Sequence, residues 1–392
     1  MSETAFSYLS LLDTTHLELG DCLNGGRDVD ALRRELVHAA WRQQVEGNAA
    51  FARFVEASGV TRFDDPDLLT SAAMPLLPST LFKREDLSLL SVPADAIVKH
   101  CLSSGTSGSV SRVERDEPTL LNFITTITSA LPALFSLDRT GDYAAIVLGP
   151  STEEVGDLWF SYVISCLGLM MPTTYCESDS EFEPALAARV IADHVAQGQP
   201  YVLIGPPHRI LDVCERVEDA GLATSHPRSY ALSAGGWKGL QARSISQAEF
   251  RRRVFSALKL ERESQVRDNF NMVELNTVLF ECEHHRKHLP PWLLVQARDP
   301  ATNAVLPDGE IGILSFMDAG AISYPCFILG EDFGSVDYSI CGCGRSGGTL
   351  TITRRMNRVE QRGCALRMSG VRAKDQSLAD RFHVSIYRRD TQ

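Results

Sequence analysis

The chain has 392 residues, of which 44% are hydrophobic and 22% are charged. This balance is typical of a globular protein and excludes a disordered chain, a collagen-like fibre and a small disulfide-stapled domain. Asp and Glu number 50 against 38 Lys and Arg, which gives a formal net charge of −12. Because an acidic surface repels phosphate backbones, we expect no nucleic-acid partner.

The N-terminal residues lack the basic, apolar and small-residue pattern of a secretory signal. The longest uncharged apolar stretch is taken to be 158–171, which is too short to cross a bilayer comfortably. It is predicted to be a buried core helix, so we expect no membrane partner. Ten cysteines are scattered along the chain. They are expected to be reduced, buried thiols of a cytoplasmic protein, or metal ligands where they cluster.

The first part of the chain is predicted to be an N-terminal helical segment over residues 1–75. Within it, apolar residues at helical spacing and a stop at Gly59 predict one helix over 28–59. Residues 64–95 contain four prolines and several aspartates. This composition predicts a surface connection that leads into the first strand.

From residue 98 onward, short apolar runs alternate with helical periods. The runs 143–148, 201–204 and 230–232 predict strands. This alternation predicts an α/β core over residues 76–290, in which helices cover both faces of a sheet. The predicted helices are 119–135, 157–171, 184–197 and 207–221.

After about residue 290 the pattern becomes β-rich. The runs 292–296, 311–316 and 350–353 are joined by turns that contain Gly, Pro and Asp. They predict a small antiparallel β unit over residues 291–354. Residues 355–392 are predicted to form a short C-terminal extension.

A hydroxyl- and glycine-rich loop follows the first predicted strand and comprises Ser103, Ser104, Gly105, Thr106, Ser107 and Gly108. Glycine lets backbone N–H groups converge on an anion, and hydroxyls add donors for phosphate oxygens. The loop lacks the Gly-Lys-Ser/Thr ending of a Walker A motif. Alone, it fits a surface turn as well as a phosphate site.

Four further segments follow this loop in a fixed order: 269–274, 307–312, 330–334 and the arginine-rich stretch that begins at 344. Together the five segments resemble the adenylate-forming superfamily of acyl-CoA synthetases, luciferases and peptide-synthetase adenylation domains. The resemblance covers roughly residues 80–365.

Within this superfamily the sequence is similar to two branches. Phe82-Lys83, the Gly-Gly-Trp-Lys run at 235–238 and the Leu-Pro-Pro-Trp run at 289–292 resemble acyl-protein synthetases of bacterial luminescence operons. Their relatives that activate aromatic acids in phenazine pathways share these features. The second branch is the phenylacetate-CoA ligase-like branch.

The resemblance implies an adenylate-forming N-terminal-domain fold and the ATP-dependent activation of a carboxylic acid. The acid, expected to be aromatic or otherwise apolar, would become an acyl-adenylate with release of pyrophosphate. Thr106 and its neighbours would hold the β/γ-phosphates, Glu274 would bind Mg²⁺, and Asp332 would accept hydrogen bonds from the ribose hydroxyls. The other nucleotide contacts that the resemblance implies are Gly235, Gly236, Asn269, Phe270, Asn271 and Arg355.

Two departures from the family pattern stand out. Asn271 replaces the usual Gly, and Val273 replaces the usual Thr. Only 38 residues follow Arg354, whereas full-length relatives carry a mobile C-terminal domain that delivers a catalytic Lys. We therefore expect that domain to be largely absent and hypothesise that Lys238 supplies catalytic positive charge. The alternative is that Lys238 is a solvated surface residue.

A cysteine- and histidine-rich pattern resembles a zinc site of the phenylacetate-CoA ligase-like branch. Thiolates and imidazoles are zinc ligands, and structural sites use four of them. The expected ligands of this structural zinc are Cys282, His288, Cys341 and Cys343. His284 or His285 could replace His288, and buried thiols with exposed histidines are the alternative.

Two rival functions stay open. Acyl-protein synthetases transfer the acyl group to their own cysteine, for which Cys364 is the candidate. The acceptor could also be a carrier-protein thiol, and a reductase could be a partner. The second rival is a non-catalytic relative that only binds nucleotide. Trp159, Phe160 and Tyr162 are candidate wall residues of the acid pocket, and core packing explains them equally well. The sequence leaves a homodimer as an option.

Overall fold

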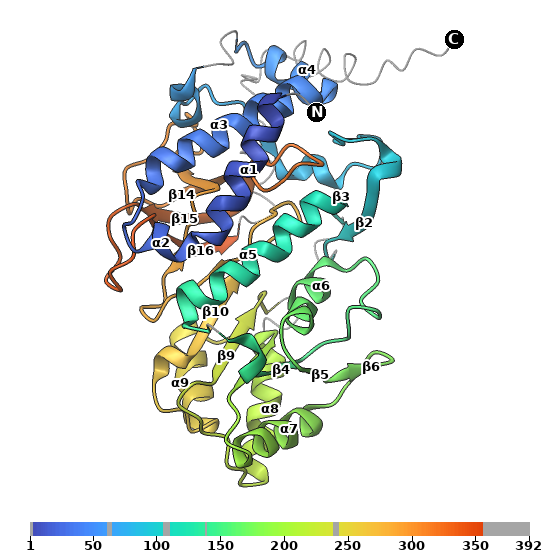
Figure 1. Ribbon diagram of the computed structural model, residues 1–392, viewed down its shortest axis with the longest axis vertical. Helices are drawn as coiled ribbons and strands as arrows, with labels where there is room; N and C mark the ends of the chain where they lie inside the picture. Colours follow the sequence, from blue (N-terminus) through green and yellow to red (C-terminus); the bar gives the residue numbers. More distant parts are fainter. Residues whose placement is uncertain (1–2, 61–64, 105–109, 138, 238–242, 356–392) are drawn as a thin grey trace.

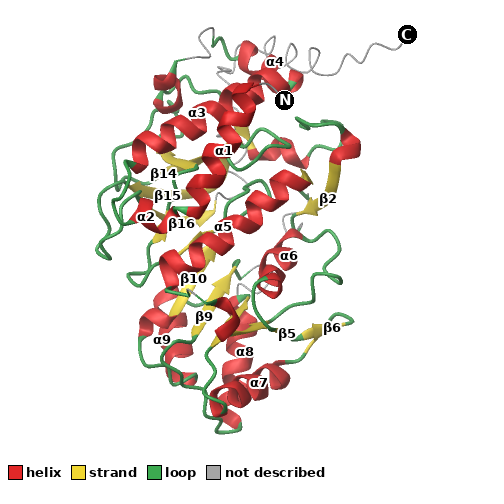
Figure 2. Ribbon diagram, in the orientation of Figure 1, coloured by secondary structure: helices red, strands yellow, loops and turns green. Residues whose placement is uncertain are grey.

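The computed structural model describes residues 3–60, 65–104, 110–137, 139–237 and 243–355 (Figure 1). Residues 105–108, Lys238 and Cys364 lie outside the described residues. The structure is an α/β fold with two six-stranded sheets, which lie in the upper and lower halves of the view (Figure 2). The predicted fold class is confirmed.

The antiparallel sheet has the strand order β12-β16-β15-β14-β13, and β1 pairs with β15 in parallel. Three of its strands correspond to the predicted runs 292–296, 311–316 and 350–353, and the long strand β15 and two short strands were not predicted. Its strands are β1 (Leu77–Pro78), β12 (Lys287–His288), β13 (Leu293–Arg298), β14 (Gly312–Asp318), β15 (Phe327–Asp337) and β16 (Thr349–Arg355).

The second sheet has the order β11-β10-β9-β8-β4-β5 and is parallel except for β11. Its strands are β4 (Ala144–Val147), β5 (Thr173–Tyr175), β8 (Tyr201–Gly205), β9 (Tyr230–Ala234), β10 (Val266–Phe270) and β11 (Leu279–Phe280). Two hairpins complete the strands: β2 (Ile97–Leu102) with β3 (Arg112–Asp116), and β6 (Glu177–Ser178) with β7 (Glu181–Phe182).

Both faces of the parallel sheet are buried. Alternate side chains of a strand point to opposite faces, and here both sets are packed in a core. In β4, Ala145 and Val147 join a core with α5 and α6, whereas Ile146 joins a second core with α7, α8 and α9. This two-sided burial explains the continuous apolar runs of these strands. The helices are α5 (Glu117–Phe135), α6 (Trp159–Ser165), α7 (Pro184–Ala196), α8 (Pro207–Asp219) and α9 (Gln247–Ala257).

The N-terminal helices pack beside the antiparallel sheet (Figure 1). They are α1 (Glu3–Leu17), α2 (Leu19–Leu23), α3 (Val29–Gly47) and α4 (Ala49–Ala57). The prediction of one helix over 28–59 is wrong, because Asn48 adopts an extended conformation between α3 and α4. Its side chain accepts a hydrogen bond from Phe51 N at 2.8 Å and caps α4.

The prediction that residues 64–95 form a surface connection is also wrong in part. Leu76, Leu77 and Phe82 are buried in the core, and Leu77 pairs with Ile328 of β15. The prolines punctuate short elements that pack inward, among them a 3₁₀ helix over Ser79–Lys83. This segment adds an edge strand to the antiparallel sheet.

The apolar segment 158–171 forms α6 and a short 3₁₀ helix, with Val163, Ile164 and Leu167 buried, as predicted. It is not the longest apolar segment. Of the described helices, α5 alone is long and apolar enough to cross a membrane, and half of that window is buried. Asn122 of α5 donates to Gly320 O at 3.1 Å, so this helix is packed as a core element.

Candidate functional site

A pocket of about 1080 Å³ lies where the two sheets and the β2–β3 hairpin meet. Asn269 comes from the parallel sheet, and Gly235 directly follows β9 of that sheet. Asp332 comes from the antiparallel sheet, and Ser104 comes from the β2–β3 hairpin. Glu274 lines the same pocket. Segments that lie far apart in the sequence, and that were predicted to bind one nucleotide, therefore surround one space.

The β2–β3 hairpin brings the described ends of the hydroxyl- and glycine-rich segment to the pocket. Ser103 N donates to Ser111 O at 3.0 Å, and Ser111 N donates to Ser103 Oγ at 2.9 Å. These bonds close the base of the loop, and both serines line the pocket. Gly105, Thr106, Ser107 and Gly108 lie outside the described residues, so their phosphate contacts stay a prediction.

Gly235 follows β9 and needs to be glycine. Its φ is +70°, and a Cβ at this position would lie 2.8 Å from the Phe160 ring. Phe160 and Gly235 thus form a close-packed part of the pocket wall. Gly236 has open space around its Cα and also lines the pocket.

The departure at Asn271 has a structural reason. Its Nδ2 donates to Leu275 O at 3.1 Å and to Thr277 O at 2.8 Å, and its Oδ1 accepts from Trp159 Nε1 at 2.7 Å. Asn271 therefore closes the loop that follows β10 and fixes Trp159 in the pocket wall. Val273 is buried in the core, which suits an apolar side chain at this position.

Arg115 holds the same loop from the other side. Its Nη2 donates to Val273 O at 2.8 Å and Leu275 O at 3.3 Å, the two carbonyls that flank Glu274. Its guanidinium lies 3.7 Å from the centre of the Trp159 ring. Because Arg115 belongs to β3, it couples the β2–β3 hairpin to the segment that carries Glu274.

We expect Arg115→Met to lower the free energy of unfolding by about 3 kcal/mol, because several buried acceptors lose their donor. Urea unfolding checks this value. Arg216→Met, on the exposed face of α8, is the control and should change stability by less than about 0.5 kcal/mol. Equal stability of the two variants would contradict the role given to Arg115.

Two further features of the pocket concern predicted ligand contacts. Asn269 is buried, and its Nδ2 has no hydrogen-bond partner among the described residues. An unpaired buried donor is costly, and a ligand acceptor in the pocket would satisfy it. Asp332 stands opposite Arg355 in the β15–β16 register, although the Arg355 side chain is not described. Phe270 also lines the pocket.

The structure adds charged wall residues that the sequence analysis did not assign. Lys83 forms a 2.8 Å ion pair with Glu331, next to Asp332. The resemblance of Phe82-Lys83 to acyl-protein synthetases was the one sequence signal that could have pointed to Lys83 as a pocket residue. The others are Arg251, Asp268, Glu281, Arg286 and Lys287. No local pattern marks them, because they pair across the fold.

Cys282, His288, Cys341 and Cys343 form a cluster whose ligand atoms all lie within 4.8 Å of one another. Cys282 Sγ lies 3.9 Å from Cys341 Sγ, and Cys343 Sγ lies 3.3 Å from His288 Nε2. Neighbouring sulfurs of a tetrahedral zinc site with 2.3 Å bonds are about 3.8 Å apart. The donor set and its spacing therefore fit zinc.

The structure separates the three candidate histidines. His288 joins the cysteine cluster, whereas His284 and His285 line the pocket. His285 Nδ1 lies 3.6 Å from Glu281. Burial lowers the pKa of His288 to about 4, so its ring is neutral at pH 7. Of the nine cysteines within the described residues, seven are buried, and Cys341 and Cys343 of the cluster are half-buried.

The fold and pocket define the class of protein. The structure resembles 2-hydroxyisobutyryl-CoA ligase in complex with 2-HIB-AMP and CoA. For the open conformation the TM-score is 0.63 at 13% identity, covering 83% of this chain and 69% of that chain. For the thioesterification state the TM-score is 0.64 at 16% identity, covering 84% and 68%. At this identity the similarity shows the fold, which is that of the adenylate-forming ligases.

The sequence comparisons define the family. The acyl-protein synthetase family, LuxE, matches residues 23–372. The long-chain-fatty-acid–luciferin-component ligase of Vibrio harveyi is 34% identical over 347 residues, which cover 86% of this chain and 87% of the relative. The ligase of the same name from Aliivibrio fischeri is 31% identical, with 88% and 89% covered. The chain belongs to the acyl-protein synthetase (LuxE) family.

Both levels of the predicted resemblance are therefore confirmed: the adenylate-forming superfamily and its acyl-protein synthetase branch. The chain is a ligase with the fold and family of enzymes that activate and transfer acyl groups.

Proposed function

We propose that this protein activates a carboxylic acid with ATP and then transfers the acyl group to a thiol. In the first step a carboxylate oxygen attacks the α-phosphorus of ATP. The bond from this phosphorus to the β-bridging oxygen breaks, which yields an acyl-adenylate and pyrophosphate. The observation that carries the proposal is the meeting of the loop base, Glu274 and Asp332 in one pocket.

The residues divide this work according to their chemistry. Ser103, Ser104 and the loop through Thr106 surround the β/γ-phosphates with hydroxyl and N–H donors. Asp332 accepts hydrogen bonds from the ribose, assisted by Arg355 at the same sheet position. Gly235 and Gly236 let the backbone approach adenine, together with Asn269, Phe270 and Asn271.

Glu274 supplies carboxylate oxygen for Mg²⁺, a hard cation that neutralises phosphate charge when bound. Lys238 contributes positive charge near the leaving group. Among the described cations that line the pocket, Lys83 lies nearest in the chain to the hydroxyl- and glycine-rich loop, and its ammonium pairs with Glu331. Pyrophosphate exchange measured in Lys238→Met and in Lys83→Met shows which of the two lysines supplies this charge.

We propose a long-chain fatty acid as the substrate, since the two relatives are named for such acids. The pocket supports an apolar chain, because Trp159, Phe160, Val163 and Met272 form part of its wall. An aromatic acid is the competing substrate. Exchange of labelled pyrophosphate into ATP, measured over a panel of fatty and aromatic acids, decides between them. Absence of exchange with every acid would remove the proposed activation step.

We propose Cys364 as the acyl acceptor that precedes delivery to a carrier or reductase. The Cys364 thiolate attacks the carbonyl carbon of the adenylate, and AMP leaves as the thioester forms. Cys364→Ser is expected to retain pyrophosphate exchange within about twofold and to lose the stable acyl-protein adduct seen by mass spectrometry. Cys176→Ala, at a buried thiol of the second core, is the control. An adduct that persists in Cys364→Ser would point to another acceptor.

We further propose that the cysteine–histidine cluster holds a structural zinc ion and that the protein works in the cytoplasm. His288 of the cluster belongs to β12 of the antiparallel sheet, and Cys282 belongs to the segment that follows β11. Zinc would tie these parts together without taking part in the chemistry.

A further inference from the structure

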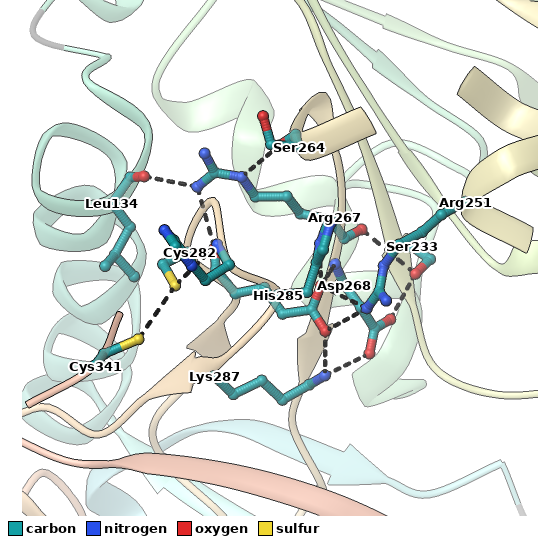
Figure 3. Close-up of polar contacts among 12 residues, drawn as sticks. Leu134, Ser233, Arg251, Ser264, Arg267, Asp268, Cys282, His285, Lys287 and Cys341 are labelled. Atoms are coloured by element: carbon teal, nitrogen blue, oxygen red, sulfur yellow. Dashed lines mark hydrogen bonds and ion pairs between the residues drawn. The ribbon is translucent and has the colours of Figure 1, made fainter. Parts of the chain in front are cut away.

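Four charged side chains form a network between the metal cluster and the pocket. We call Arg251, Asp268, Glu281 and Lys287 the ionic cluster. Lys287 Nζ lies 2.8 Å from Asp268 Oδ2 and 3.1 Å from Glu281 Oε1. Arg251 Nη2 lies 3.0 Å from Glu281 Oε1. Figure 3 shows Lys287, Asp268 and Arg251 together, with Cys282 and Cys341 to their left.

The ionic cluster is buried and balanced. The Glu281 side chain is 3% exposed, and those of Lys287, Arg251 and Asp268 are 11%, 15% and 16% exposed. Two cations face two carboxylates, and all four residues line the pocket. Removing one member of such a network leaves the charges of its neighbours buried and less fully compensated, so the members act together.

The network is tied to the metal ligands through the chain itself. Glu281 precedes Cys282, and Lys287 precedes His288. Glu281 and Lys287 form an antiparallel bridge, and Cys282 N donates to Arg286 O at 2.9 Å. Residues 281–288 thus form a hairpin. Since neighbouring residues of an extended chain point to opposite faces, one face of this hairpin carries metal ligands and the other carries Glu281 and Lys287 of the ionic cluster.

The network also fixes the pocket wall at β10. The Asp268 carboxylate accepts from Lys287 on one oxygen and from Ser233 Oγ at 2.5 Å on the other. Its backbone N–H donates to Glu281 Oε2 at 2.9 Å. Asp268 is followed by Asn269, whose buried amide has an unpaired donor at the pocket.

We propose that Lys287 is a positioning residue that transmits the geometry of the metal-bound hairpin to Asp268 and Asn269, so that metal occupancy sets nucleotide affinity. The inference rests on the proposed nucleotide site. With metal bound, the hairpin holds the ammonium between the two carboxylates. Without metal, the four ligands lose their common centre, the hairpin loosens, and the wall at β10 loses its support.

The test is a cycle that combines metal removal with Lys287→Met in the full chain. The affinity for ATP with Mg²⁺ is measured by calorimetry, and zinc content by elemental analysis. Lys287→Met should retain its zinc and bind ATP about 10- to 100-fold more weakly. This is the size of effect expected when the charge-assisted bonds from Lys287 no longer hold the pocket wall in place. Chelated wild-type protein should show a similar loss, and chelation of Lys287→Met should weaken ATP binding by less than about threefold more.

Arg298→Met is the matched control. Arg298 is a fully buried cation of β13 that lies outside the pocket and the metal cluster. Its loss should lower stability while leaving ATP affinity and zinc content unchanged. If Lys287→Met does not fold, the same cycle of mutation and metal removal is carried out with Glu281→Gln, because glutamine keeps the shape of the glutamate side chain.

Three results overturn the inference: unchanged ATP affinity in Lys287→Met, loss of zinc from that variant, or fully additive effects of mutation and chelation. Wild-type protein that binds no ATP even with zinc present would instead reject the proposed nucleotide site. The two failures are therefore distinguishable.

Discussion

Glu274→Gln is expected to lower acid-dependent pyrophosphate exchange by about 100- to 1000-fold, the usual effect of removing one preorganised electrostatic contact. The amide keeps the size of the carboxylate and removes its charge, so Mg²⁺ is held less well. The half-saturating Mg²⁺ concentration should therefore rise in this variant. Arg115 fixes the carbonyls on both sides of residue 274, so the loop should stay in place.

Glu218→Gln, on an exposed turn of α8, provides the control for Glu274→Gln. It should leave exchange and Mg²⁺ dependence unchanged. Exchange within threefold of wild type in Glu274→Gln would remove this side chain from the proposed metal site, whatever the control shows.

Cys341→Ala is expected to lose the bound zinc and to unfold at a temperature about 5–15 °C lower. A ligand present at 1000 times its Kd stabilises the folded state by about 4 kcal/mol, and this contribution disappears with the metal. Calorimetry and elemental analysis measure the two effects. Chelation of wild-type protein should reproduce the lower melting temperature.

Cys176→Ala tests whether any lost thiol has this effect. Cys176 is buried in the second core, away from the cluster. Its substitution should leave zinc content unchanged, with a smaller shift in melting temperature. Wild-type protein purified without chelators and found free of zinc would contradict the metal assignment.

The regular elements were predictable because burial leaves a direct pattern. Strands such as β8, with all five residues buried, appear as continuous apolar runs. The break between α3 and α4 was missed because the apolar spacing continues past Asn48. At this residue the backbone is extended and the side chain caps α4, so the helix is interrupted. Residues 64–95 were misjudged because their prolines suggest a surface turn, while Leu76 and Phe82 fill the core.

The site could be predicted where its chemistry is local in sequence. The four candidate metal ligands were predicted because two separate segments rich in cysteine and histidine resemble a zinc site of the phenylacetate-CoA ligase-like branch, and the structure brings these segments together. The ionic cluster was missed because Asp268, Glu281 and Lys287 are common charged residues whose pairing depends on the fold. Arg115 was missed for the same reason, since its partners lie about 160 residues away.

A crystal structure with a non-hydrolysable acyl-adenylate mimic tests the central proposal most directly. We predict adenosine between the glycines at 235–236 and Asp332, with the phosphate mimic toward the serine-rich loop and Glu274. Electron density for the adenosine at any other surface, with this pocket filled only by solvent, would contradict the assignment.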